Sequence, residues 1–308
     1  MNRLTANISL YFITFFAAVQ YAFLANVPDS VSTFAFLSVT NLIGFLILLC
    51  VFFGELSRLD KKQVTQSIIL SLELFGFNVF LMLGSRGTSA TVVACVLSAY
   101  FAFIVLISFL VFHKVPEKNK LTGVLVMLVG VLFMMEINLR GLMDRKILWL
   151  VIADVFFAVY LLTAEKYAVS SNPSVLAMGQ TFFSFLLTAL FWLGESLLLK
   201  KPLYLPSEPS FWGSVFFISF FIRGLYGIVQ IYAQRYTSPL NVSLIFSTEI
   251  IMTMLVSPFL TRLLGTEPDR ITPLRVIGAL LMMGGILISD SDVAESLKRR
   301  LKHEKKQS

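Results

Sequence analysis

The chain has 308 residues, of which 57% are hydrophobic and only 14% are charged, and its formal net charge is +7. Soluble globular chains carry roughly 25% charged residues, and at a mean hydropathy of +0.82 this chain has too few polar residues to cover its apolar surface in water. The composition excludes a single soluble domain and predicts a protein surrounded by a lipid bilayer over most of its length.

Ten apolar runs follow one another along the chain with short connections between them. A helix needs about 20 residues to cross roughly 30 Å of hydrocarbon, and eight of the runs are about that long. The fifth and tenth runs are shorter and need flanking residues to span. The expected spans are, in chain order, 6–27, 31–54, 63–85, 88–112, 121–135, 147–164, 173–194, 211–232, 239–261 and 276–289.

Four of these runs carry one ionisable residue near the middle: Glu73, Asp154, Arg223 and Glu249. A charge at the centre of a bilayer costs at least about 2.5–3.5 kcal/mol, so such residues are expected to face one another or a water-filled cavity. We expect one of the three acids to pair with Arg223. The other two carboxyls would then meet a cationic group of a substrate or carry protons.

Uncharged polar residues repeat at helical spacing along the same runs, which places them on the faces that would line this cavity. The residues predicted to bind a substrate are Arg223, Glu249, Asp154, Glu73, Tyr226, Gln230, Gln180, Tyr100 and Gln20. An aromatic wall would come from Tyr21, Phe157, Tyr160 and Tyr226. The alternative interpretation is that the polar residues only hold packed helices together and contact no ligand.

The sequence has no pattern typical of an enzyme or a metalloprotein. Cys50 and Cys95 lie in apolar runs without metal-ligand spacing, and we find no HExxH, GxSxG or phosphate-loop motif. We therefore expect no cofactor, no metal and no catalytic residue. A membrane enzyme built on a carboxylate pair, Glu73 and Asp154, or a scaffold without transport activity, is the less favoured alternative.

The end of the chain is basic, since six of its last eleven residues are Lys298, Arg299, Arg300, Lys302, Lys305 and Lys306. A basic segment after a final apolar run is typical of a cytoplasmic flank, so we expect both termini in the cytoplasm. A nucleic-acid-binding arm is not favoured, because nothing globular or aromatic accompanies the segment.

The two halves of the chain resemble each other at a constant offset. The segment 86–90 (Arg-Gly-Thr-Ser-Ala) precedes the fourth run, and the segment 235–239 (Arg-Tyr-Thr-Ser-Pro) precedes the ninth, 149 residues later (235 − 86). Ser98 and Ser247 match at the same offset. Since five spans is an odd number, the second copy must enter the bilayer upside down, which is a recurrent plan of transporters.

The repeat predicts an all-α membrane protein with ten transmembrane helices, arranged as two inverted five-helix repeats around a central cavity. The first repeat is expected over 1–146 and the second over 147–289, followed by a basic cytoplasmic tail over 290–308. Glycines in the two short runs permit close approach of backbones, and we expect helix packing or a homodimer contact there. These glycines are Gly123, Gly130, Gly278, Gly284 and Gly285.

Several short motifs are similar to those of a known family. They lie at 160–167 in the sixth run, at 233–239 and 243–249 around the start of the ninth run, and in the glycine-rich last run. On these motifs the chain resembles EamA-type members of the drug/metabolite transporter superfamily. The resemblance implies ten spans in two inverted repeats, a cavity open alternately to each side, and a bacterial inner membrane. The chain departs from the family pattern at Arg86 and its neighbours, where an aromatic residue such as Tyr236 is usual.

The charged residues favour one class of substrate. The planar fork of Arg223 suits a carboxylate, and an ammonium group would meet Glu249 or Asp154. We expect a secondary transporter that moves amino-acid-like zwitterions by alternating access, with proton coupling through the spare carboxyls. The alternatives are an organic cation, a nucleoside-containing metabolite or a nucleotide sugar. Phosphorylated ligands usually need several cationic side chains, and only Arg223 is available in mid-membrane.

Overall fold

The computed structural model describes residues 3–58, 60–112, 118–136, 144–200, 202–264 and 270–289, and this part of the chain is helical with no strand. The basic tail expected at 290–308 lies outside the described residues. The first half contains α1 (Arg3–Ala25), α2 (Thr33–Phe52), the 3-10 helix η1 (Phe53–Arg58), α3 (Lys61–Ser85), α4 (Ala90–Leu97), α5 (Tyr100–Phe112) and α6 (Lys118–Met134). The second half contains α8 (Arg145–Ser170), α9 (Pro173–Leu199), α10 (Pro209–Phe217), the π-helical segment η2 (Ile218–Tyr226), α11 (Gly227–Gln234), α12 (Pro239–Ser247), α13 (Glu249–Leu264) and α14 (Pro273–Ser289).

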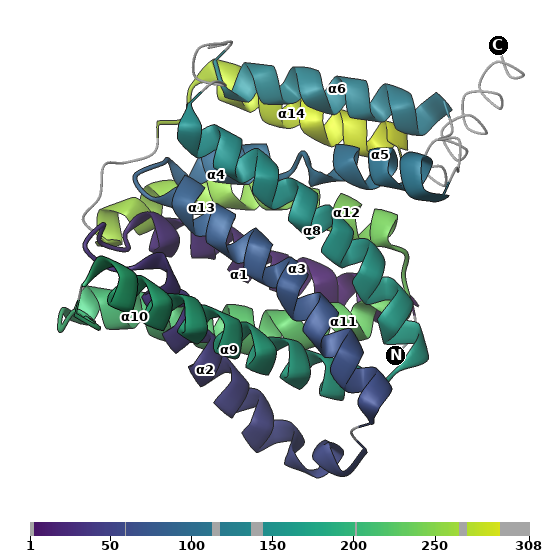
Figure 1. The fold of residues 1–308 in the computed structure, drawn as a ribbon. Helices are drawn as coiled ribbons and strands as arrows, with labels where there is room; N and C mark the ends of the chain where they lie inside the picture. The colour runs from purple at the N-terminus through teal and green to yellow at the C-terminus, as the bar shows by residue number, and fades with distance from the viewer. Residues whose placement is uncertain are drawn as a thin grey trace, which may run out of the picture.

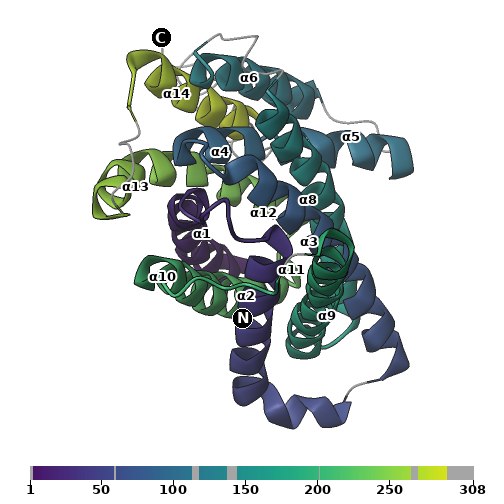
Figure 2. The ribbon, with the colours of Figure 1, turned by 60° about the vertical axis from the view of Figure 1, so that its left-hand side comes forward.

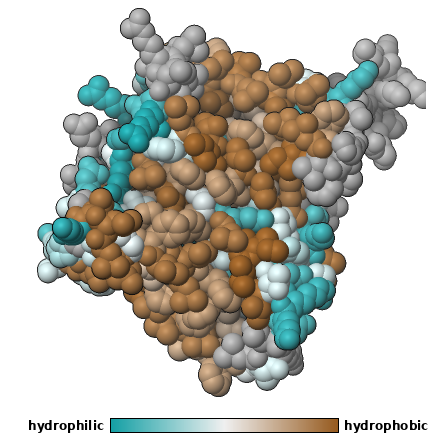
Figure 3. Space-filling model, in the orientation of Figure 1, coloured by the Kyte–Doolittle hydropathy of each residue, from teal (hydrophilic) through white to brown (hydrophobic). Residues whose placement is uncertain are grey.

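Within the described residues, eight helical stretches are long and apolar enough to cross a bilayer, by length and composition. They correspond to the eight longer runs of the sequence. Four of them combine consecutive elements, namely α2 with η1, α4 with α5, α10 with η2 and α11, and α12 with α13. The helices α6 and α14 have 17 residues each and are shorter than the roughly 20 that a span needs. In Figure 3 hydrophobic residues cover the middle of the visible face, and hydrophilic residues gather at two opposite margins.

The two short helices α6 and α14 pack against each other along one edge of the bundle (Figures 1 and 2). Their glycines make the contact: a Cβ atom at Gly130 would lie 2.8 Å from the carbonyl oxygen of Gly278, and one at Gly285 would lie 2.6 Å from that of Gly123. Because backbone meets backbone here, a larger side chain would separate the helices. Four of the five glycines singled out from the sequence therefore serve packing within the chain, while a homodimer stays a prediction.

The fourth and ninth spans begin with the same kind of cap. Ser89 at the start of α4 and Ser238 at the start of α12 each accept a hydrogen bond from the backbone N–H three residues further on, at 3.4 and 3.3 Å. Such caps satisfy amide groups that a helix start would otherwise leave without a partner. The two serines stand 149 residues apart (238 − 89), the offset found in the sequence.

The same two spans are interrupted at matching places. α4 and α5 are separated by residues 98–99, and α12 and α13 by Thr248 alone. The Ala99 N–H donates to the Val96 oxygen at 2.9 Å, and the Thr248 N–H donates to the Ile245 oxygen at 3.1 Å. These three-residue bonds tighten the last turn before each interruption. The residues that resume the helices, Tyr100 and Glu249, are again 149 positions apart (249 − 100).

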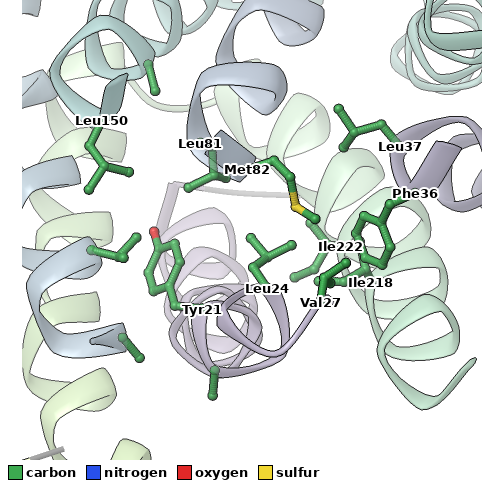
Figure 4. Packing of buried hydrophobic residues seen from close by; sticks show 14 of the residues in the cluster. Tyr21, Leu24, Val27, Phe36, Leu37, Leu81, Met82, Leu150, Ile218 and Ile222 are labelled. Carbon is green, nitrogen blue, oxygen red and sulfur yellow. The ribbon is translucent and has the colours of Figure 1, made fainter. Parts of the chain in front are cut away.

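Two apolar clusters occupy opposite ends of the bundle. The first end cluster lies where α1 and α3 end and α2 and α8 begin, and it includes Leu24, Phe36, Met82 and Leu150 (Figure 4). The second end cluster lies where α1 begins and α8 ends, and it includes Leu10, Leu161, Ala168 and Leu176. Between these clusters, in the middle of the bundle, the structure collects polar side chains.

Candidate substrate cavity

The middle of the bundle contains a cavity with polar and aromatic walls. It is lined by residues of α1, α2, α3, α4, α5, α8, α9, η2, α11 and α13. Seven of the nine residues predicted to bind a substrate line it, and they come from positions far apart in the sequence. These are Gln20, Tyr100, Gln180, Arg223, Tyr226, Gln230 and Glu249. Their role as ligands stays a prediction, but their convergence is a property of the fold.

Arg223 reaches the cavity from the π-helical segment η2. Segments of π-helix are rare and frequently occur at functional sites, because the wider turn changes the direction of side chains. Opposite Arg223 stands Gly44 of α2, where an added Cβ atom would clash with the Cβ atom of Arg223. The absence of a side chain at Gly44 therefore lets α2 lie directly against the segment that carries the arginine.

The hydrogen-bond partner of Arg223 is an amide. Its Nη1 donates to Oδ1 of Asn78 at 2.8 Å, and Nδ2 of Asn78 donates to the backbone oxygen of Leu74 at 2.6 Å, which fixes the orientation of the amide. In the described part of the chain no carboxylate lies within ion-pair distance of the guanidinium, and its Nε has no partner. The predicted pairing of Arg223 with an acid is wrong in this conformation, and donors of the guanidinium remain for a ligand.

Glu249 lies at the first position of α13, directly after the interruption of the ninth span. A carboxylate is favoured at a helix N-terminus, where backbone N–H groups point toward it. The Tyr21 hydroxyl lies close enough to its side chain to interact with it, while Oε1 has no partner among the described residues. The acid thus has one neutral polar neighbour and keeps an oxygen for a further contact.

Aromatic rings surround the charged groups, as the sequence predicted. Tyr21, Phe157, Tyr160 and Tyr226 all line the cavity. The ring of Phe157 lies 5.1 Å from that of Tyr100 and 5.9 Å from that of Tyr160, measured between centroids. The Tyr160 hydroxyl also donates to Oε1 of Gln180 at 3.3 Å. These contacts fix the rings, so the wall is formed before any ligand enters.

A model of the EamA-like transporter family matches the chain over residues 4–136 and again over residues 144–289. The chain belongs to the EamA-like transporter family. The family resemblance of the sequence motifs is thereby confirmed, and with eight apolar helices the chain is a multi-pass membrane protein with a transport role.

Relatives of this EamA-like protein carry the same general description. A protein of Archaeoglobus fulgidus named "Uncharacterized transporter" is 26% identical over 288 residues, covering 94% of this chain and 86% of the relative. The "Uncharacterized transporter YyaM" of Bacillus subtilis is 24% identical over 243 residues, covering 75% of this chain and 74% of the relative. A solved structure titled "Crystal structure of protein" aligns with a TM-score of 0.65 at 18% identity, covering 97% of this chain and 98% of that chain. At this identity the last similarity shows the fold alone.

Two of the nine predicted residues of the EamA-like protein lie outside the cavity lining, which corrects the expectation that all four charges converge. The cavity-facing residues of α8 are Phe157 and Tyr160, and at about 100° per residue Asp154 points roughly a quarter turn away from them. Glu73 is turned away from the cavity-facing residues of α3 in the same manner, and its side chain lies near Thr163 of α8.

Sequence reasoning also missed two cavity residues, Asn41 of α2 and Asn78 of α3. Both are buried, with 2% and 5% of their surface exposed. An asparagine inside an apolar run is itself a signal, because its amide must find partners away from lipid. The search for ionised side chains passed over these two amides, one of which turns out to hold Arg223.

A second hollow opens at the end of the bundle beside the first end cluster, and Asp29, Arg86 and Glu195 line it. The Arg86 guanidinium donates to the backbone oxygen of Val31 at 2.8 Å, and the Ser32 hydroxyl donates to the Glu195 carboxylate. Burial lowers the pKa of Arg86, and the two carboxylates act in the opposite direction. Arg86 therefore joins the connection between α3 and α4 to the connection between α1 and α2 at this end.

Proposed function

We propose that this EamA-like protein is a secondary transporter that carries small zwitterions of the amino-acid class through the central cavity by alternating access. The observation that carries the proposal is that Arg223 and Glu249, of opposite charge, line one cavity, and each is held by a neutral partner. A zwitterion would supply the two missing charges.

The contacts of Arg223 favour a carboxylate ligand. Asn78 accepts only one of the five N–H donors that a guanidinium carries. A carboxylate could accept two parallel hydrogen bonds from the remaining donors, which gives both strength and a fixed orientation. Because the Asn78 amide is uncharged, it does not neutralise the guanidinium of Arg223, which can still attract an anion.

The surroundings of Glu249 favour an ammonium group. Its carboxylate keeps one oxygen without a partner in the described structure, and the rings of Tyr21, Tyr100 and Tyr226 lie near enough to interact with it electrostatically. Cations are attracted both to a carboxylate and to the faces of aromatic rings. An ammonium group would therefore find two kinds of attraction at this side of the cavity.

The proposal includes ten spans in two inverted five-helix repeats, with α6 and α14 as the fifth and tenth. It is supported by the two family matches, by the paired caps and by the paired interruptions of the fourth and ninth spans. Interrupted helices at a midplane site are a recurrent feature of transporters built from inverted repeats. We further propose a bacterial inner membrane with both termini in the cytoplasm, as the basic tail suggests.

Alternating access needs a barrier on each side of the binding site. The two end clusters are suited to this role, since each closes one end of the bundle with apolar side chains. The contacts of Arg86 with Val31 and of Ser32 with Glu195 add polar ties at the first end. In this arrangement the cavity would be occluded from both sides, and separating either cluster would open it.

An organic cation without a carboxylate is the second candidate. It is favoured by the three tyrosines beside Glu249, but it would leave the remaining donors of Arg223 unused. Phosphorylated ligands are less suited, because Arg223 is the only Lys or Arg among the residues that line the cavity in the described structure.

Thermal-shift screening of the purified protein, followed by uptake into proteoliposomes, tests the proposal. We expect L-amino acids to stabilise the protein and to be taken up, and we expect both responses to be lost in Arg223→Ala and Glu249→Ala. Tetramethylammonium tests the second candidate. Stabilisation by tetramethylammonium without any response to amino acids would replace the first proposal by the second. Amino-acid uptake that both substitutions leave unchanged would contradict the site assignment.

A further inference from the structure

Asp154 is the most deeply buried acid in the described structure. It lies in the middle of α8 with 0% of its surface exposed, outside the lining of the cavity. Neither of its carboxyl oxygens has a hydrogen-bond partner among the described residues. An isolated carboxylate in such surroundings is strongly disfavoured, and a group of this kind binds a proton instead of staying charged.

The neighbours of Asp154 give it no positive charge. The elements packed against α8 are α3, α4, α5, α11 and α12. Their titratable residues within the membrane are Glu73 of α3, Cys95 of α4, Tyr100 of α5 and Tyr232 of α11, and none of these is a cation. Among the described residues no lysine or arginine lies within ion-pair distance of Asp154. Nothing in this conformation compensates a negative charge there.

The other two mid-membrane acids are in different surroundings. Glu249 contacts the cavity and the Tyr21 hydroxyl, and Glu73 contacts Thr163 and is half-buried. Each therefore has a polar neighbour. Among the three acids, Asp154 alone has no polar partner in the described structure, and it does not line the cavity.

Tyr100 connects Asp154 to the cavity. It lines the cavity and interacts electrostatically with both Asp154 and Glu249. It also stands at the interruption between α4 and α5, where the backbone already departs from the regular helix. A change of charge at Asp154 would therefore change the electrostatic potential at Tyr100 and so at the cavity. A movement at the interruption would change the access of water to Asp154.

We propose that Asp154 is the proton-binding group of this transporter and is separate from the substrate ligands. In the conformation seen here it holds a proton. When the α4–α5 interruption moves and admits water, the O–H bond of the carboxyl breaks, the proton passes to water and a carboxylate remains, with no transfer of electrons. This proposal adds a proton-binding group to the proposed transporter, and the coupling step rests on the proposed function.

Infrared spectroscopy of the full chain in lipid nanodiscs tests proton binding without any substrate. A protonated carboxyl has a carbonyl band that a carboxylate lacks. At about pH 7, well above the ordinary pKa of aspartate, we expect this band in the natural protein. The part of the band that belongs to Asp154 should be kept in the control variants Glu73→Gln and Glu249→Gln and lost in Asp154→Asn. A band that is absent from the natural protein, or unchanged in Asp154→Asn, would overturn the proposal.

Transfer of the same nanodiscs to heavy water tests proton release. We expect the Asp154 band to shift as deuterium replaces the proton, more slowly than any band of Glu249, which lines the cavity. A band that never shifts while the backbone amides exchange would identify a permanently buried structural acid and would also overturn the proposal.

Proteoliposomes test the coupling step. In Asp154→Asn we expect amino-acid uptake to lose its dependence on a pH gradient, while exchange of labelled for unlabelled amino acid across the membrane continues. Gradient-driven uptake that continues in Asp154→Asn would overturn the coupling role. If the natural protein moved no amino acid at all, the proposed function would fail, whereas the infrared result would still decide whether Asp154 binds a proton.

Discussion

The two halves of the chain, residues 4–136 and 144–289, contribute unequally to the cavity. The described residues of the first half that line it all have neutral side chains, among them Gln20, Tyr21, Asn41, Asn78 and Tyr100. The second half supplies both charges, Arg223 and Glu249. The halves share their caps and interruptions, yet at the matching positions one half has Tyr100 and the other has Glu249.

The two halves therefore have different roles in the cavity: the first half positions the charged side chains, and the second half carries the charges that would bind a ligand. The first half holds the charges of the second in place, through Asn78 on Arg223 and through Tyr21 on Glu249. Neutral partners orient a charge without cancelling it, so both groups remain attractive to a ligand. The substitutions below test this division, from the largest expected effect to the smallest.

Removing the cationic group should have the largest effect. Arg223→Ala deletes one partner of a buried charged contact, a loss of about 2–5 kcal/mol, which corresponds to at least roughly 30-fold weaker binding of amino acids. Isothermal titration of the purified protein measures the change. Arg262→Ala on the exposed part of α13 is the control, and equal affinities in the two variants would contradict the role of Arg223.

Removing the anionic group should have the next largest effect. Glu249→Gln keeps the shape of the side chain but loses a hydrogen bond to a charged group, a loss of about 1.5–3 kcal/mol or more than roughly tenfold in affinity. Uptake of labelled amino acid into proteoliposomes is the measurement. Glu73→Gln, which changes an acid outside the cavity, should leave uptake nearly intact, and a larger loss there would reverse the assignment.

Changing the neutral partner of Arg223 tests directly whether the first half positions the charges of the second. Asn78→Ala removes one hydrogen bond to the guanidinium and should weaken binding by about 1.5 kcal/mol, roughly tenfold. The matched control is Asn41→Ala, since Asn41 is another buried amide of the lining and has no hydrogen bond to a charged group in the described structure. Titration of both variants with the same amino acid gives the comparison.

Replacing Asn78 by aspartate instead of alanine tests whether a charged partner blocks Arg223. Asn78→Asp would give the first half a charge, and the resulting ion pair should occupy Arg223 and compete with a carboxylate ligand. We expect Asn78→Asp to bind amino acids more weakly than Asn78→Ala. The opposite order would show that Arg223 does not bind a carboxylate.

The smallest effect is expected from Tyr21→Phe. It removes the hydroxyl that lies beside Glu249 but keeps the ring, so the loss should be about 0.5–1.5 kcal/mol, or two- to tenfold. Tyr11→Phe on the exposed surface of α1 is the control. If Tyr21→Phe weakened binding as much as Glu249→Gln does, the tyrosine would be a ligand in its own right and the division between the halves would fail.

Much of the fold could be predicted from the sequence because lipid imposes a simple rule. A chain in hydrocarbon must satisfy its backbone within helices, so the long apolar runs at 6–27 and 31–54 could hardly form anything else. The recurring Ser89 and Ser238 marked the starts of equivalent helices, since a capping serine acts locally. The π-helical turn at Arg223 and the interruption before Glu249 had no such local signal.

By itself the sequence determined the helical spans, the likeness of the halves, the family, and the presence of charges that lipid alone could not tolerate. The tertiary structure alone decided which of these charges meet: it brought Arg223 and Glu249 to one cavity, gave Arg223 an amide as partner, and turned Glu73 and Asp154 away. The reason is geometric. Hydropathy fixes that a segment crosses the bilayer, whereas the rotation of each helix about its axis depends on contacts such as the one between Gly44 and Arg223, and a quarter turn is enough to move a side chain from the cavity into the packing between helices.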